Sequence, residues 1–451
     1  MSDAVSAKYA KHVNPGFVDL LGTFGYGRVF VRGEGCFLVD EQGRRYLDAL
    51  AGFGATNLGH NHPKLLARVR DFLESGHPNL VHTGPQPLAA DLAERLALRS
   101  GLEVALFTSS GAEAVEAGMK VARAATGRAG FLSCEGGFHG TNLGTLSIMH
   151  GKRWRGPFEP LLSGCERVPF GDVAAASKAL ATRKFAAFVV EPILGEGGVI
   201  VPPPDWLKTI AAACKVSGTL LVVDEVQTGM GRTGALFAVQ HVGVVPDVLV
   251  LAKSLGGGLV PIGAALVSAG LHKAAYGKPD RFDLHSSTFA GNALACACAL
   301  ATLDILDDER LIDNAAARGK QLVDGLRARL AGHPLVREVR GAGLLVGLEL
   351  GPASDSFAAR LSAPLVRTVA REVFGQWLAL RLLEAGIVAQ PASQQWDVLR
   401  LEPPLTIDEA GITAIIDAVG RILDEYRSTP PVLADVAKRL GEQWQRGWTF
   451  R

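Results

Sequence analysis

Three short apolar runs in the middle of the chain each stop at or near an ionisable side chain. They occupy residues 185–190, 220–223 and 248–251, and the ionisable residues that follow them are Glu191, Asp224 and Lys253. Such runs, rich in valine and leucine, are typical of strands buried on both faces. A helical pattern over residues 205–216 separates the first two runs. In an open α/β sheet ligands bind beyond the carboxyl ends of the strands, so the three side chains are expected to converge on one crevice.

Lys253 is an unusual residue to find at the end of a buried strand. Burial disfavours the charged ammonium and lowers the pKa of a lysine, which leaves a neutral, nucleophilic amine. Such an amine forms a Schiff base with a carbonyl, and pyridoxal phosphate enzymes combine it with an acid opposite the pyridine nitrogen. Asp224 is the candidate acid. The alternative is a lysine whose ammonium merely reaches out of the strand end into water.

Length and composition exclude several classes of partner. At 451 residues the chain is longer than one hydrophobic core supports, so two or more subdomains are expected. The formal net charge of +1 gives no basic surface for nucleic acid or for an anionic membrane, and no apolar run reaches membrane-spanning length. The first residues lack the apolar centre of a signal peptide. Six cysteines without metal-ligand spacing are expected to be free thiols, so a cytoplasmic protein is predicted.

Two further stretches carry candidate cofactor contacts. Ser110 and Glu113 form a capping-box pattern ahead of a helical run, where unpaired backbone N–H groups suit a phosphate. Phe138 and His139 lie on a glycine-rich loop, and an aromatic pair there is able to stack on a flat ring. Each feature also has a structural explanation, a well-capped helix in the first case and a structural histidine in the second.

A dinucleotide-binding fingerprint is formally present and is rejected. Gly229, Gly231 and Gly234 match G-x-G-x-x-G, and Asp247 lies near the expected acidic position. The first glycine comes too late after the strand that ends at Asp224, and no helical pattern begins at the last one. An oxidoreductase that uses NAD is therefore the weaker interpretation.

The flanking segments predict a second α/β region. Short alternating strands over residues 17–48 indicate an antiparallel meander, and the glycine-rich loop after it carries Phe53. A strand over residues 340–347 and a helix over 363–386 follow the central sheet. Arg400, on a later strand, is able to clamp a carboxylate with two hydrogen bonds.

In order and spacing, these stretches resemble the class III aminotransferases, the ornithine and ω-amine branch of the fold-type I pyridoxal phosphate enzymes. The resemblance covers about residues 14–423 and is nearest to the putrescine aminotransferases in the segments NPGF, AGFG, DEVQTGMGRTG, LAKSLGGG and RLEPPLT. It implies a large, mostly parallel sheet domain and a smaller α/β domain built from N- and C-terminal segments. The implied boundaries are 1–75 and 316–427 for the small domain, 76–315 for the large domain, and 428–451 for a tail without an assigned role.

The resemblance also implies roles around the cofactor. Lys253 holds pyridoxal 5'-phosphate as an internal aldimine and moves the proton between the substrate carbon and the cofactor carbon. Asp224 keeps the pyridine nitrogen protonated, so that the ring withdraws electrons. Val226 and Phe138 sandwich the ring, and Gln227 reaches its phenolic oxygen.

Phosphate binding and subunit structure follow from the same resemblance. It assigns the phosphate to three residues at a helix N-terminus, Ser110, Gly111 and Ala112. Thr288 of the partner subunit completes the phosphate site, so the active sites are expected to be shared across a homodimer. His139 and Glu191 complete the cofactor site, with Glu191 behind the residues that touch the ring.

Substrate choice is expected to depend on four residues. Glu196 and Arg400 resemble the family's gated pair, in which the glutamate masks the arginine for an amine substrate and frees it for a dicarboxylate. The chain departs from the ornithine-type members at Thr141, where they carry arginine, and at Phe53, where ornithine aminotransferase has tyrosine. Two groups for a distal carboxylate are thus missing, which argues against ornithine or acetylornithine as the donor.

The predicted function is transamination from a primary amine, such as a diamine, to a small 2-oxo acid, either 2-oxoglutarate or pyruvate, by a ping-pong cycle through a pyridoxamine form. The alternatives are an ornithine or acetylornithine aminotransferase, a biosynthetic aminotransferase for a specialised aldehyde or ketone, and an aminomutase or decarboxylase of the same fold. A catalytically silent cofactor-binding protein is disfavoured because Lys253, Asp224 and Arg400 are all present.

Overall fold

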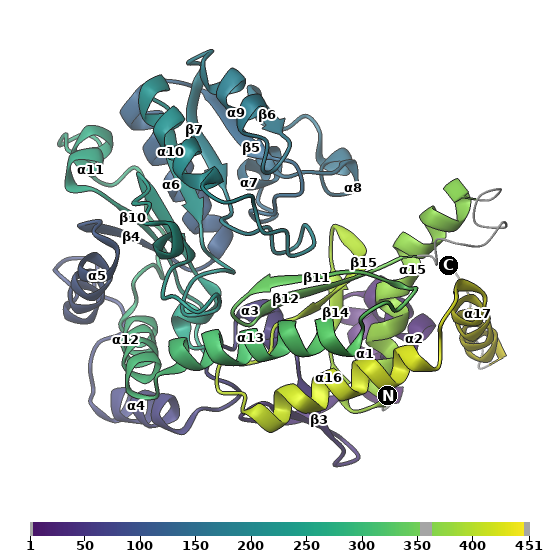
Figure 1. Cartoon of the computed structure of the whole chain (residues 1–451). Coiled ribbons are helices and arrows are strands. Elements are labelled where there is room, and N and C mark those ends of the chain that lie inside the picture. The colour runs from purple at the N-terminus through teal and green to yellow at the C-terminus, as the bar shows by residue number, and fades with distance from the viewer. Residues whose placement is uncertain (1–2, 352–362, 446–451) are drawn as a thin grey trace.

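Two regions make up the computed structural model, which describes residues 3–351 and 363–445 (Figure 1). A seven-stranded sheet with its helices occupies the upper part of the view, and two four-stranded sheets with their helices lie below and to the right. Both ends of the described chain lie in the lower region. The architecture is that of an α/β protein, as predicted.

The seven-stranded sheet carries the ionisable strand ends. Its order is β4-β10-β9-β8-β7-β5-β6, with the last five strands parallel and β10 antiparallel to both of its neighbours. The strands are β4 (Val104–Thr108), β5 (Gly130–Cys134), β6 (Cys165–Val168), β7 (Phe185–Val190), β8 (Leu220–Asp224), β9 (Val248–Leu251) and β10 (Gly263–Val267). All six residues of β7 are buried, as a run of consecutive apolar residues predicts. The three strands expected from the apolar runs are confirmed.

Helices cover the sheet closely. On one face α6 (Gly111–Thr126) contacts β4, β7, β8, β9 and β10, and α11 (Ala269–Tyr276) packs on α6. Small residues allow this approach, since a Cβ on Gly118 would lie 3.2 Å from Cγ1 of Val222 and of Val248. The other helices of this region are α4 (Pro63–Glu74), α5 (Pro87–Ser100), α7 (Leu143–Ile148), α8 (Lys152–Arg155), α9 (Val173–Leu180), α10 (Trp206–Ser217) and α12 (Ala293–Asp308). The predicted crossover helix between β7 and β8 is α10.

Segments from the two ends of the chain share one sheet in the smaller region. β13 (Ile387–Val388) runs parallel to β3 (Arg45–Asp48) and completes the sheet β1-β2-β3-β13, while the second sheet has the order β11-β12-β15-β14. The remaining elements there are β1 (Phe30–Glu34), β2 (Phe37–Asp40), β11 (Val336–Ala342), β12 (Leu345–Leu350), β14 (Gln390–Ala392), β15 (Gln395–Leu401), α3 (Ala51–Gly54), α13 (Leu311–Arg329), α15 (Ala363–Glu384) and α16 (Glu409–Asp424). The shared sheet confirms a small α/β domain built from N- and C-terminal segments.

Two sequence predictions in this region are wrong in detail. The meander expected from residue 17 begins only at β1, because helix α2 (Pro15–Phe24) precedes it and follows α1 (Asp3–His12). Asn14 caps α2 by accepting a hydrogen bond from Phe17 N at 3.0 Å. The single strand expected over 340–347 is a hairpin of β11 and β12, and Gly343 reverses the chain there with a φ of 52°.

The C-terminal tail forms helix α17 (Thr429–Gln445), which packs against α2 and α15. Trp377 of α15 donates from Nε1 to Asp435 Oδ2 at 2.9 Å, and Arg439 Nε donates to the same oxygen at 2.9 Å. The hydrogen bond from Trp377 fastens α17 to α15, and the packing of α17 on α2 brings the two ends of the chain together in the small region (Figure 1).

Two further properties concern the whole described part of the chain. Within residues 3–351 and 363–445, none of the helices combines the length and the apolarity needed to cross a bilayer.

All six cysteines are free, as predicted. Burial raises the pKa of the Cys214 thiol to about 12, so this thiol stays protonated and unreactive near neutral pH.

Candidate active site

A cavity of about 200 Å³ lies at the carboxyl ends of β7, β8 and β9. It brings together residues from the strand ends, the α6 N-terminus and two loops, namely Gly111, Ala112, Phe138, His139, Gly140, Glu191, Glu196, Asp224, Val226, Gln227 and Lys253. The three strand-end side chains therefore meet in one crevice, as their positions in the sequence predict.

Lys253 provides the amine of this cavity. It begins the 3₁₀ helix η3 (Lys253–Gly256) two residues after β9, and its φ of 46° is a strained value for a residue other than glycine. Burial lowers the pKa of the Lys253 amine, an effect that Arg400 reinforces and that Glu196 and Glu402 oppose. The net lowering favours the neutral, nucleophilic amine.

Asp224 faces the cavity as half of a buried pair with His139. Its Oδ2 lies 2.8 Å from His139 Nδ1, and its Oδ1 accepts a hydrogen bond from Val226 N at 3.0 Å. Burial by itself lowers the pKa of His139, but the hydrogen bond and the charge of Asp224 raise it above its usual value. No described residue partners the buried His139 Nε2. The histidine thus orients the carboxylate from behind.

Glu191 ties together the two loops that border the cavity. Its Oε1 accepts from Phe138 N at 2.8 Å, and its Oε2 accepts from Gly195 N at 3.0 Å. Burial raises the pKa of this carboxyl to about 7. The Glu191 side chain therefore positions Phe138 and the segment that leads to Glu196.

The N-terminus of α6 borders the cavity beside Val226. Ser110 caps the helix by accepting from Glu113 N at 3.2 Å, as the capping-box pattern predicts, while Glu113 Oε2 accepts from Ser109 N at 2.7 Å. The first turn of a helix leaves N–H groups unpaired and carries a partial positive charge. A Cβ on Gly111 would lie 3.0 Å from Val226 Cγ1, so glycine allows Val226 to pack directly against the start of the helix.

Arg400 lies behind the cavity and is completely buried. Its Nη1 donates to Glu196 Oε1, and Glu196 Oε2 accepts from Ser393 N at 3.1 Å. Burial alone would raise the pKa of Glu196, but Arg400 and Lys253 lower it to about 2. The glutamate is therefore ionised and covers the guanidinium, as expected for a masked arginine.

Glu402 is a functional candidate that sequence reasoning missed. It is completely buried, its Oε2 lies 3.1 Å from Arg400 Nε, and its Oε1 accepts from Gln227 Nε2 at 2.9 Å. Glu402 directly follows β15, and residues two apart in an extended chain point to the same face, so the RLEPPL segment did contain a signal that an acidic residue accompanies Arg400.

Besides Arg400, four predicted site residues lie outside the cavity wall. Phe53 is 41% exposed, and its ring centroid lies 5.2 Å from Arg400 Cζ. Thr141 is exposed and follows Gly140, which lines the cavity. Ser110 acts through the helix cap, and Thr288 lies exposed on the surface of its own subunit.

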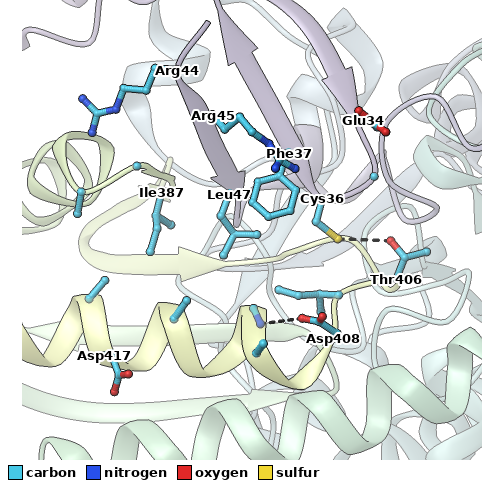
Figure 2. A pocket seen from close by; sticks show the side chains of 18 of the residues that line it. Glu34, Cys36, Phe37, Arg44, Arg45, Leu47, Ile387, Thr406, Asp408 and Asp417 are labelled. Carbon is cyan, nitrogen blue, oxygen red and sulfur yellow. Dashed lines mark hydrogen bonds between the residues drawn. The ribbon is translucent and has the colours of Figure 1, made fainter.

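A larger pocket lies elsewhere, between the N-terminal strands and α16 (Figure 2). Its volume is about 1090 Å³, and two of its polar side chains make contacts within the fold. Cys36 Sγ lies 3.5 Å from Thr406 Oγ1, and Asp408 Oδ1 accepts from Gly411 N at 2.7 Å. The chemically distinctive side chains gather in the smaller cavity, which is the better candidate for catalysis.

A lysine and an aspartate at neighbouring strand ends, with a helix N-terminus beside them, define a pyridoxal phosphate-dependent transferase of fold type I. The family model Aminotransferase class-III matches residues 25–423. The chain belongs to this family, and it is an aminotransferase.

Comparison with known proteins places the chain among named relatives. It is 38% identical to the putrescine aminotransferase of Pectobacterium atrosepticum, over 96% of this chain and 91% of that protein. It is 37% identical to the aminotransferase PigE of a Serratia species over 93% of this chain, and it spans only 53% of that longer protein. A solved ornithine aminotransferase from Toxoplasma gondii, with pyridoxal phosphate at partial occupancy, aligns with a TM-score of 0.79 at 33% identity, over 89% and 91% of the two chains.

The cavity fits the cofactor on which this family depends. Lys253 supplies the amine and Asp224 the acid, both at the cavity wall. Gly111 and Ala112 bring the first turn of α6 to the cavity wall, where its N–H groups suit a phosphate. The chain therefore uses pyridoxal 5'-phosphate.

Proposed function

We propose that the protein transfers an amino group from a primary amine without an α-carboxylate, such as a diamine, to 2-oxoglutarate or pyruvate. The observation that carries this proposal is the state of Arg400, which is covered by Glu196 and paired with Glu402. A covered arginine offers nothing to a carboxylate on the donor, whereas the carboxylates around it attract an ammonium. The identity to a putrescine aminotransferase supports the same choice.

Lys253 and Asp224 carry the chemistry in this proposal. Bound pyridoxal phosphate supplies an electron sink that acidifies the carbon bearing the amino group. Lys253, whose amine has a lowered pKa, would attach the cofactor. The freed amine would then carry the proton between the substrate carbon and the cofactor carbon. Asp224, held by His139 and by Val226 N, keeps the ring nitrogen protonated.

The remaining cofactor contacts orient the ring. Val226 and Phe138 line the cavity and would cover the two faces of the cofactor ring. Phe138 is held in place by an edge-to-face contact with Trp154, at 5.7 Å between ring centroids. Gln227, which donates to Glu402, would contact the phenolic oxygen. Gly111 and Ala112, at the start of α6, would offer their N–H groups to the phosphate.

The acceptor requires Arg400 to be uncovered. A 2-oxo acid brings a carboxylate, which takes the Arg400 guanidinium after Glu196 turns away. The buried Arg400 Nη2 has no hydrogen-bond partner among the described residues, so it remains a donor for the carboxylate once Glu196 has turned away. One arginine thus serves the acceptor without attracting a carboxylate-bearing donor.

Ornithine is a second candidate donor, favoured by the likeness to the solved ornithine aminotransferase and by the presence of Arg400. Thr141 and Phe53 argue against it because neither side chain carries a positive charge for a carboxylate. A panel of amines and amino acids against pyruvate and 2-oxoglutarate tests the choice. Faster turnover of ornithine than of putrescine contradicts the proposal, and release of a free 2-oxo acid or aldehyde in half-reactions excludes an aminomutase.

Thr141→Arg should reverse part of this preference. A charged hydrogen bond to a carboxylate contributes about 1.5–3 kcal/mol, so kcat/KM for ornithine is expected to rise about tenfold or more. Putrescine should lose efficiency because its distal ammonium then faces a like charge. Thr209→Arg, at an exposed position on α10, adds the same charge away from the cavity and should leave the ratio unchanged. An unmoved ratio in Thr141→Arg means that Thr141 takes no part in donor choice.

A homodimer with shared active sites belongs to the same proposal. The loop that carries Thr288 exposes three large apolar side chains, with Phe282 at 74% and Leu284 and Phe289 each at 56%. Such side chains gathered on one loop suit burial against a second copy. Mixing inactive Lys253→Ala with an inactive Thr288→Ala protein should restore part of the activity in heterodimers. No recovery, alongside proven subunit exchange, contradicts a shared site.

A further inference from the structure

Arg400 has two carboxylate partners of different kinds. Glu196 lines the catalytic cavity and forms an ion pair with Arg400, which lies behind the cavity wall. Glu402 lies on the opposite side of the guanidinium, against Nε at 3.1 Å, where solvent does not reach either side chain. Its second oxygen holds Gln227, which itself lines the cavity. Glu402 therefore places a negative charge one side chain away from the substrate.

The backbone around Glu402 is fixed more firmly than that around Glu196. Glu402 N donates to Ala49 O at 2.8 Å, and Pro403 and Pro404 follow it with φ set by their rings. Glu196 sits in a glycine-rich segment, Gly195 to Gly198, which permits movement. When Glu196 turns away for an acceptor, Glu402 stays in place.

The cluster sets two buried arginines against two buried carboxylates. Arg400 pairs with Glu196 and Glu402, and the charge of Glu402 also acts on the buried guanidinium of Arg232. Buried charges are screened far less than surface charges, so the carboxylate of Glu402 weakens the attraction of Arg400 for a substrate carboxylate. Without this negative charge, the cluster would favour an added carboxylate and oppose an added ammonium.

We propose that Glu402 is a specificity-determining residue, whose fixed carboxylate tempers Arg400 and biases the site toward amines with a distal ammonium. This inference rests on the proposed amine transaminase. It assigns to Glu402 a role different from that of Glu196: Glu196 opens and closes access to Arg400, whereas Glu402 sets how strongly the exposed arginine holds a carboxylate.

Binding of glutarate, a dicarboxylate without a reactive carbonyl, tests the charge directly. Glu402→Gln keeps the shape of the side chain and an oxygen for Gln227, but removes the charge. Titration calorimetry on the holoenzyme should show glutarate binding at least about fivefold more tightly to Glu402→Gln than to the wild type. Unchanged or weaker binding by a folded variant overturns the proposal.

Donor choice gives a second readout from the same variant. Putrescine has an ammonium where butylamine has a methyl group, so the ratio of their kcat/KM values reports the preference for a distal charge. Glu402→Gln should lower this ratio at least about fivefold, and an unchanged ratio counts against the proposal. If the wild type uses neither amine, the proposed donor is wrong, and the glutarate titration alone decides the role of Glu402.

Two further variants separate charge from packing. Glu402→Asp keeps the charge but withdraws it from Arg400, so both readouts should move in the same direction by a smaller factor; this variant also decides the question if Glu402→Gln does not fold. Glu225→Gln removes another buried carboxylate, one that accepts from Val239 N at 2.8 Å and lies outside the cavity wall. It should lower thermal stability without moving either readout, and an equal shift in this control overturns the assignment.

Discussion

Lys253→Ala lowers kcat for the amine half-reaction by about 10²–10⁴-fold, the usual contribution of a positioned general acid or base. The reason is geometric as well as chemical. Lys253 lines the cavity, and its backbone is held in the left-handed region with a φ of 46°. The lowered pKa of its amine makes it a base at a pH where a surface lysine is still charged. Single-turnover absorbance of the loaded enzyme measures the effect.

The site of cofactor attachment checks the same assignment independently. Purified enzyme should be yellow, and borohydride reduction followed by peptide mapping should place the cofactor on Lys253. A small primary amine added to Lys253→Ala should restore part of the lost rate. Lys184→Ala is a matched control, since Lys184 pairs with Glu166 on the surface and such pairs contribute little. A label on another lysine, or turnover of Lys253→Ala within tenfold of the wild type, contradicts the assignment.

The sequence sufficed for the central sheet and the strand-end groups because both follow from local pattern. Buried parallel strands leave continuous apolar runs, and their carboxyl ends meet at one edge of the sheet. Glu191, Asp224 and Lys253 therefore converge on one cavity, as expected. The Ser110 cap was equally local, since the side-chain acceptor and the N–H of Glu113 lie three residues apart.

The role of Glu402 could not be predicted from the local sequence pattern. Its spacing from Arg400 is visible in the sequence. Its significance depends on the fold, which places Arg400 at the end of β15 against Glu196 and places Glu402, just after β15, against Gln227. Helix α2 is a different case. Asn14 and Pro15 are a standard helix start, so its N-terminal signal was present and was outweighed by the strand-like residues that follow.

Asp224→Asn separates cofactor binding from catalysis. The amide retains the shape of the side chain and is able to accept from Val226 N, while the lysine and the start of α6 still hold the cofactor. It has no charge with which to keep the ring nitrogen protonated. Losing a charged hydrogen bond of about 1.5–3 kcal/mol lowers the rate roughly 10- to 150-fold.

His139 supplies a second measurement on the same variant. Asp224 raises the pKa of His139 against the effect of burial, so the raised value should fall in Asp224→Asn. The histidine then loses its proton at lower pH than in the wild type, and imidazole NMR signals follow this change without any turnover. Asp247→Asn makes the same substitution at an exposed carboxylate that accepts from Leu221 N at 2.8 Å, and it should leave both the rate and the His139 pKa unchanged. If Asp224→Asn turns over at nearly the wild-type rate while the His139 pKa falls, the carboxylate orients the histidine and takes no part in activating the ring.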